Sequence, residues 1–210
     1  MPIICPTILA DNPHAYREQL ERIESFASRI QIDLTDSEFT PTHTINPVQA
    51  YWKDGMIIDM HIMYSQPANH IEQLIDMKPS MIILHAEAEG ELLEMFNEIG
   101  ASGIKTGVAL LKSTTVQSAE LLIEAVDHVL IFSGDLGKFG GKADYGLFEK
   151  IIQVKEIDQE VEIGWDGGID DQNAADLVRA GVDVLNVGRF IQKADNHKNA
   201  YDILNEIIHQ

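Results

Sequence analysis

The chain has 210 residues with 45% hydrophobic content, enough to bury one substantial core, and nothing in it marks a linker or a second domain. We therefore expect one domain spanning residues 1–210. The formal net charge of -19 at pH 7 argues against a nucleic-acid-binding protein, which would carry a basic face, and against binding to an anionic membrane surface. An anionic ligand would be held locally by backbone amides, a metal ion or a few cations, for which the candidates are Lys112, Lys138, Lys142 and Arg189.

The cysteine content and the first residues of the chain bear on the compartment. One cysteine, Cys5, cannot form an internal disulfide, so a reducing cytoplasm is the simplest location. Its place inside an apolar run favours a buried structural thiol over a nucleophile. The amino terminus has no positively charged lead and turns polar after about ten residues, so we expect neither a secretory signal nor a membrane span.

Short aliphatic runs alternate with helical patterns from one end of the chain to the other. Asn12 and Pro13 open the first predicted helix, as a cap and a first-turn proline. The strands are predicted at residues 3–9, 30–34, 56–63, 81–84, 103–110, 128–132, 161–165 and 182–187. Further helix starts are expected at Gln66 with Pro67, at Ser113 or Thr114, and at Asp170, and a closing helix at residues 200–208.

Residues 161–191 hold two buried-strand patterns, one amphipathic helix and two glycine turns in a fixed order. The first strand stops at Asp166, before Gly167 and Gly168, and the second stops before Gly188 and Arg189. Glycines at the ends of both strands leave free N–H groups that suit a phosphate. A DGG sequence alone is equally consistent with a tight turn, but two glycine loops in one βαβ unit favour the phosphate site.

The number and length of these units predict the fold class. About eight βα units of roughly 25 residues each are what a closed parallel (β/α)₈ TIM barrel requires. An open doubly wound sheet is the alternative, but it would show a glycine fingerprint after the first strand, and here the glycine loops lie late in the chain.

If the barrel is correct, polar residues collect at the carboxyl ends of its strands. Asp33 and Asp166 lie in apolar strands, where a charged residue is costly unless it is paired or bound to a metal. His61 could join them through a shared divalent ion, and two oxygens with one imidazole nitrogen suit zinc, iron or manganese. Gln31 shares a strand face with Asp33.

Structural interpretations compete with each of these assignments. A strand-end aspartate such as Asp33 often caps the following turn. His61 alone, and His85 after the fourth strand, would more often be interior histidines with satisfied hydrogen bonds. Asp59 lies deeper in its strand and is expected to make structural hydrogen bonds, and Met63 is expected to pack, or to form a wall of the pocket.

Several stretches resemble ribulose-phosphate 3-epimerases, a (β/α)₈ barrel family, and the resemblance covers nearly the whole chain. CPTILADN is similar to the family's first strand and loop, IQIDLTDSEFTP to its second strand and catalytic loop, DMHIM to its third strand and LHAE to its fourth. FGG, WDGGI and the VGR turn are similar to its phosphate-binding loops. No single piece is specific, but their order and spacing together are.

The resemblance implies a metal-assisted 1,1-proton transfer at C3 of a ketose phosphate, in pentose phosphate metabolism. Asp33 and Asp166 would be the acid/base pair and also metal ligands, with His61 a further ligand. Gln31 stands where the family has a second metal-binding histidine, and its amide is a weaker ligand, so magnesium is also considered. Substrate and phosphate would contact Thr7, Met63, Phe139, Gly140, Gly141, Gly167, Gly168, Gly188 and Arg189. We also expect a homo-oligomer.

Two other functions stay open. Gln31 and Arg189 are also consistent with a related phosphate-binding barrel that runs an aldolase or decarboxylase reaction, because the VGR turn resembles that of orotidine-phosphate decarboxylase and hexulose-phosphate barrels. A non-catalytic sugar-phosphate sensor that has lost its metal is the third possibility.

Overall fold

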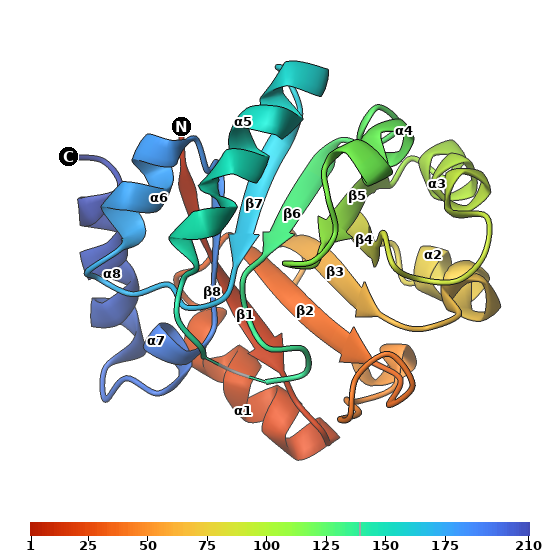
Figure 1. Cartoon of the computed structure of the whole chain (residues 1–210). Helices are drawn as coiled ribbons and strands as arrows, with labels where there is room; N and C mark the ends of the chain where they lie inside the picture. The colour runs from red at the N-terminus through yellow and green to blue at the C-terminus, as the bar shows by residue number, and fades with distance from the viewer. Residues whose placement is uncertain (139) are drawn as a thin grey trace.

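Eight parallel strands close into a barrel, with helices around the outside (Figure 1). The computed structural model describes residues 1–138 and 140–210. Each strand pairs with the next in sequence and β8 pairs with β1, so the predicted (β/α)₈ barrel is confirmed and the open sheet is excluded. The strands are β1 (Ile3–Leu9), β2 (Arg29–Thr35), β3 (Ile57–Met63), β4 (Met81–His85), β5 (Lys105–Leu110), β6 (His128–Phe132), β7 (Glu162–Asp166) and β8 (Val184–Val187).

The alternation of residues along β2 shows how this barrel is built. Ile30, Ile32 and Leu34 are at most 1% exposed and belong to the large core between strands and helices. Gln31 and Asp33 alternate with them and point into the barrel, because successive side chains in a strand face opposite sides. The interior is therefore polar near these strands, while a small apolar cluster fills it elsewhere: Met81, Ile83, Ala109 and Leu130.

The helices between the strands are short, and several are preceded by 3₁₀ turns. None of the helices in the described part of the chain is long and apolar enough to span a membrane. The α-helices are α1 (Pro13–Ile23), α2 (Ile71–Asp76), α3 (Leu92–Ala101), α4 (Glu120–Ile123), α5 (Phe148–Ile157), α6 (Ala174–Ala180), α7 (Arg189–Gln192) and α8 (His197–Ile207). The 3₁₀ turns are η1 (Pro47–Gln49), η2 (Pro67–His70), η3 (Gln117–Ala119) and η4 (Tyr145–Leu147).

Helix starts are the features for which sequence and structure agree least. The Asn12 cap is confirmed, since its side chain accepts from the N–H groups of His14 and Ala15 at 3.0 Å. The cap at Ser113 or Thr114 is wrong, because the Thr114 hydroxyl bonds Glu87 instead. Asp170 does not cap α6 either.

Asp170 forms a turn before the helix. Its side chain accepts from the N–H of Gln172 at 3.0 Å, and α6 begins only after Asn173. Asn173 instead donates to the carbonyl of Gly168 at 2.7 Å, which ties the start of α6 to the preceding glycine loop. The segment predicted to begin a helix at Gln66 starts as a 3₁₀ turn before α2.

A buried ion network closes the amino-terminal end of the barrel. Arg29 donates to Asp59 at 2.6 Å and to both carboxylate oxygens of Glu162 at 2.9 and 2.7 Å. His128 adds a contact to Glu162 at 2.8 Å. The structural role expected for Asp59 is therefore confirmed. Cys5 is also buried in the barrel wall, as a structural thiol would be.

Arg29→Leu should destabilise the fold by about 3–5 kcal/mol, because it leaves the carboxylate of Asp59, which is 1% exposed, without its cation. The free energy of unfolding in urea, followed by circular dichroism, measures this loss. The matched control is Arg179→Leu, whose ion pair with Asp176 is exposed and should matter by less than about 1 kcal/mol. Equal losses in the two variants would contradict the structural role of the network.

Candidate active site

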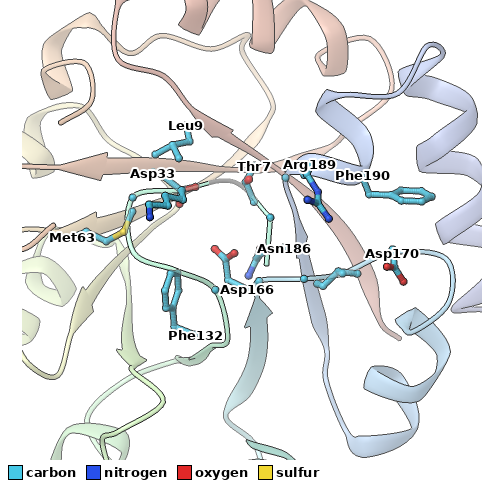
Figure 2. A pocket seen from close by; sticks show the side chains of 18 of the residues that line it. Thr7, Leu9, Asp33, Met63, Phe132, Asp166, Asp170, Asn186, Arg189 and Phe190 are labelled. Carbon is cyan, nitrogen blue, oxygen red and sulfur yellow. The ribbon is translucent and has the colours of Figure 1, made fainter. Parts of the chain in front are cut away.

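A cavity of ≈ 230 Å³ opens at the carboxyl ends of the strands (Figure 2). Its walls come from the ends of β1, β2, β3, β6, β7 and β8 and from the loops that follow the last three of these strands. Asp33 and Asp166 reach it from different strands and turn toward the same space in Figure 2. The structure thus brings together the two aspartates that the sequence singled out.

Gln31 links the two carboxylates. Its Nε2 donates to Asp33 Oδ1 at 2.8 Å and to Asp166 Oδ2 at 2.6 Å. One NH₂ group therefore bridges the two carboxylates. Asp33 is only 8% exposed and the side chain of Asp166 16%, so water screens their repulsion poorly. The close pair therefore resists carrying two negative charges.

The cost of that second charge appears in the pKa of Asp166. Burial, followed by the charge of Asp33, raises this pKa to about 7, although His61 and the hydrogen bond from Gln31 act in the opposite direction. Asp166 therefore gains and loses its proton near neutral pH, where an ordinary aspartate is fully ionised. A carboxyl group in this state can both accept and donate a proton, which general acid–base chemistry requires.

A chain of contacts through two buried histidines leads from the pair of aspartates to Glu87. His61 Nδ1 lies 3.0 Å from Asp33 Oδ1 and 3.9 Å from Asp166 Oδ2. His61 Nε2 lies 2.8 Å from His85 Nε2, and His85 Nδ1 lies 3.2 Å from Glu87 Oε2. Burial lowers the pKa of His85 to about 4, so this ring is neutral at pH 7.

These contacts constrain the roles of the ring nitrogens. A neutral His85 that donates from Nδ1 to Glu87 can accept at Nε2, so His61 donates from its own Nε2. His61 Nδ1 then faces Asp33 and Asp166, where it donates to Asp33 when it carries a proton and offers a lone pair to a cation when it does not. His85 is an interior histidine with both nitrogens bonded, as its structural interpretation predicted, and it also orients the ring of His61.

Asp33, His61 and Asp166 could hold a metal ion, because one ligand atom from each lies within 4.8 Å of the other two. Two carboxylate oxygens and a lone imidazole pair form a donor set that divalent transition metals accept. Gln31 turns its NH₂ group toward this space, and its Oε1 is buried without a hydrogen-bond partner in the described structure. Gln31 could act as a ligand only with the amide reversed.

Glycines let the loops after β6 and β7 pack against each other beside the cavity. Gly167 and Gly168 have φ of 113° and 75°, and a Cβ at either would lie 2.1 Å from a backbone nitrogen, of Gly134 and Ala143 respectively. No other residue could occupy these positions without moving the loops. The resulting wall of backbone between these two loops suits an anion.

Arg189 brings a cation to this wall. A Cβ on Gly140 would lie 3.1 Å from Arg189 Nη1, so the loop after β6 contacts the guanidinium closely. Lys138 also lines the cavity, whereas Lys112 and Lys142, which were also expected to hold an anion, are absent from the described lining. The anion-binding part of the cavity thus draws on Arg189 and Lys138.

The structure gathers most of the predicted substrate-contacting residues. Gly141 is exposed and is not among the lining residues, and Phe139 lies outside the described residues. The cavity also has lining residues that the sequence did not single out, such as Phe132 and Asn186. The predicted residues that line the cavity are Thr7, Met63, Gly140, Gly167, Gly168, Gly188 and Arg189.

Two supporting residues escaped the sequence analysis. Glu87 lies two positions after His85, and this spacing at the end of β4 was a usable signal. Asn186 interrupts an aliphatic strand at a position whose side chain faces into the barrel, in register with Asp166, and that interruption was also visible.

The chain is similar to known proteins over nearly its whole length. The family model described as "Ribulose-phosphate 3 epimerase family" matches residues 3–192. Ribulose-phosphate 3-epimerase of Helicobacter pylori (strain J99) is 30% identical over 213 residues, covering 97% of each chain. The enzyme of the same name from Bacillus subtilis is 29% identical over 206 residues, covering 94% of this chain and 95% of its own.

Solved structures with the same fold are more distant in sequence. 3-Hexulose-6-phosphate synthase from Salmonella typhimurium superposes with a TM-score of 0.74 at 14% identity and covers 99% of both chains. KGPDC from Streptococcus mutans gives a TM-score of 0.77 at 13% identity, covering 99% of this chain and 97% of its own. At such identities the likeness supports the fold alone.

In the metal-free protein, the carboxyl group of Asp166 should titrate with a midpoint near pH 7 in ¹³C NMR. In Asp33→Asn the midpoint should fall, because the nearby negative charge that raises it is gone. An unchanged midpoint in that variant would show that the two carboxylates do not interact.

The same shift should make part of the stability depend on pH. Since folding raises the pKa of Asp166 from its usual 3.8 to about 7, this group's contribution to stability is full below pH 3.8 and is lost as the pH rises through 7. The difference in unfolding free energy between wild type and Asp166→Asn should therefore decline across that window. Asp195→Asn, on an exposed position, should show no such decline.

Proposed function

Because this chain belongs to the ribulose-phosphate 3-epimerase family, we propose that it interconverts the C3 epimers of a ketose 5-phosphate, ribulose 5-phosphate and xylulose 5-phosphate. The observation that carries the proposal is the pair of buried aspartates, Asp33 and Asp166, facing one cavity beside a glycine-rich anion site. We further propose that residues 1–210 act as one catalytic domain.

The reaction explains why two carboxyl groups are needed. One aspartate in its ionised form removes the proton from C3 on one face of the substrate, and the electron pair of that bond moves toward the C2 carbonyl. The other aspartate, protonated, delivers its proton to C3 on the opposite face, which inverts the configuration. The next turnover in the reverse direction starts from the exchanged protonation states, which suits a pair that includes a carboxyl of pKa about 7.

A proton next to a carbonyl is too weakly acidic for a carboxylate unless the developing oxyanion is stabilised. A divalent cation, when bound, would supply that stabilisation. We propose that Asp33, His61 and Asp166 hold it, with zinc, iron or manganese suited to the donor set and magnesium as a weaker possibility. His85 and Glu87 would keep the lone pair of His61 directed at the ion.

The phosphate would lie at the other end of the cavity. The loops carrying Gly140, Gly167 with Gly168, and Gly188 with Arg189 converge there and offer backbone amides and a guanidinium. This local site offsets the repulsion expected from a chain of net charge -19. Thr7 and Met63 would contact the sugar between the two ends.

The alternative is a lyase reaction, an aldolase or decarboxylase, on the same barrel. Arg189 at the anion site favours it. Formation of a one-carbon product from a six-carbon sugar phosphate, with no isotope exchange at C3 of ribulose 5-phosphate, would select this alternative over the epimerase.

Asp33→Asn and Asp166→Asn should each lower epimerisation of ribulose 5-phosphate by about 10²–10⁴-fold, because each removes the proton carrier on one face. Conversion of ribulose 5-phosphate to xylulose 5-phosphate, followed by NMR with metal-loaded protein, measures this. The control Asp195→Asn, on an exposed position, should retain wild-type conversion. Absence of C3 exchange in the wild-type protein with every candidate metal would reject the epimerase.

Gln31→His should strengthen metal binding by about tenfold or more, because an imidazole nitrogen replaces an amide that offers its NH₂ group. Competition with a chelator, using zinc, measures the affinity. Gln117→His places the same imidazole on an exposed turn and serves as the control for binding outside the cavity. Equal gains in the two variants would mean that zinc does not bind beside Asp33 and Asp166.

A further inference from the structure

Asn186 is a buried polar residue that the proposed chemistry leaves without a role. It lies on β8, in register with Asp166 on β7 and with Cys5 on β1. The residue is 2% exposed and forms part of the cavity wall. Neither Oδ1 nor Nδ2 of its amide has a hydrogen-bond partner in the described structure.

A structural amide would be bonded to the protein. Asn173, also buried, donates to the carbonyl of Gly168 and accepts from the N–H of Asp170, so it fixes a loop. Gln31 uses its NH₂ group to join two carboxylates. Asn186 does neither, and a buried amide with two unmet groups is destabilising unless a ligand or an ordered water satisfies it.

The position of Asn186 indicates which part of a ligand it would meet. In Figure 2 its side chain lies between Asp166 and Arg189, that is, between the carboxylate pair and the anion site. It precedes Gly188 of the anion-binding loop by two residues. A ligand that reaches from one end of the cavity to the other must therefore pass this amide.

If a ketose 5-phosphate binds as proposed, its C3 lies at the aspartates and its phosphate at the glycine loops. The only hydroxyl group between these two points is the one on C4. An amide can donate to and accept from the same hydroxyl, so both unmet groups of Asn186 find a partner there. An apolar side chain at this position would pack as well but could not recognise that oxygen.

We propose that Asn186 hydrogen-bonds the C4 hydroxyl of the substrate and makes the enzyme selective for ketose phosphates that carry it. This inference rests on the proposed epimerase function. It assigns Asn186 to substrate recognition, whereas Asp33 and Asp166 carry out the proton transfer.

The test combines two substrates with two proteins. Ribulose 5-phosphate and its 4-deoxy analogue are compared as substrates of wild type and of Asn186→Leu. Wild type should prefer the natural substrate in kcat/KM by on the order of tenfold or more, whereas Asn186→Leu should not discriminate between the two. If the variant keeps the wild-type preference, Asn186 does not recognise the C4 hydroxyl.

A binding measurement separates this inference from the epimerase proposal. If wild type shows no turnover of ribulose 5-phosphate, the epimerase proposal fails, and calorimetry with ribitol 5-phosphate and inorganic phosphate still tests Asn186. Asn186→Leu should weaken ribitol 5-phosphate by about tenfold and leave inorganic phosphate unchanged. Equal effects on both ligands, or no effect on either, would overturn the role of Asn186.

The thermal midpoint of the variant gives a further check. Removing two unsatisfied buried groups should leave the midpoint of Asn186→Leu at or above that of wild type. A marked fall would instead assign Asn186 to the fold. Asn186→Ala, which adds no apolar bulk, should show the same loss of substrate discrimination.

Discussion

The repulsion between two buried carboxylates is the constraint on which this site depends. Asp33 and Asp166 are brought together by strands on either side of β1 and β8, and the closed barrel prevents them from separating. Everything nearby lowers the cost of their contact. Gln31 donates to both, His61 directs one nitrogen at them, and one carboxyl keeps its proton near neutral pH. A cation would complete the same compensation, so the proposed acid–base chemistry and the proposed metal binding would have one physical origin.

The support for this pair extends well below the cavity surface. Glu87 accepts from His85, from the N–H of Leu111 at 3.0 Å and from the hydroxyl of Thr114. Lys150, on α5, donates at 2.6 Å to the carbonyls of Leu111 and Thr114. An outer helix is thereby linked, through Leu111, Thr114 and a series of hydrogen bonds, to the ring orientation of His61. Such layered support keeps reacting groups in place within a small tolerance.

The sequence predicted those features that follow from periodicity, and missed those that depend on neighbours in space. Strand ends are visible in one dimension, so Asp33, His61 and Asp166 could be placed together once a barrel was expected. Thr114 looked like a helix cap because its true partner, Glu87, lies 27 residues away. Asn186 looked like a polar interruption, since only the fold shows that its amide lacks any partner within the described residues.

The ion network around Arg29 fills the amino-terminal end of the barrel. The described cavity opens to solvent at the opposite end, beside the loops after β6, β7 and β8. A bound sugar phosphate would block this opening, and the water in the cavity would have to leave before the sugar phosphate could bind. A hydrogen taken from carbon could then equilibrate with the bulk only after the occupant departs, so the lifetime of the complex would govern how much isotope is washed out per turnover.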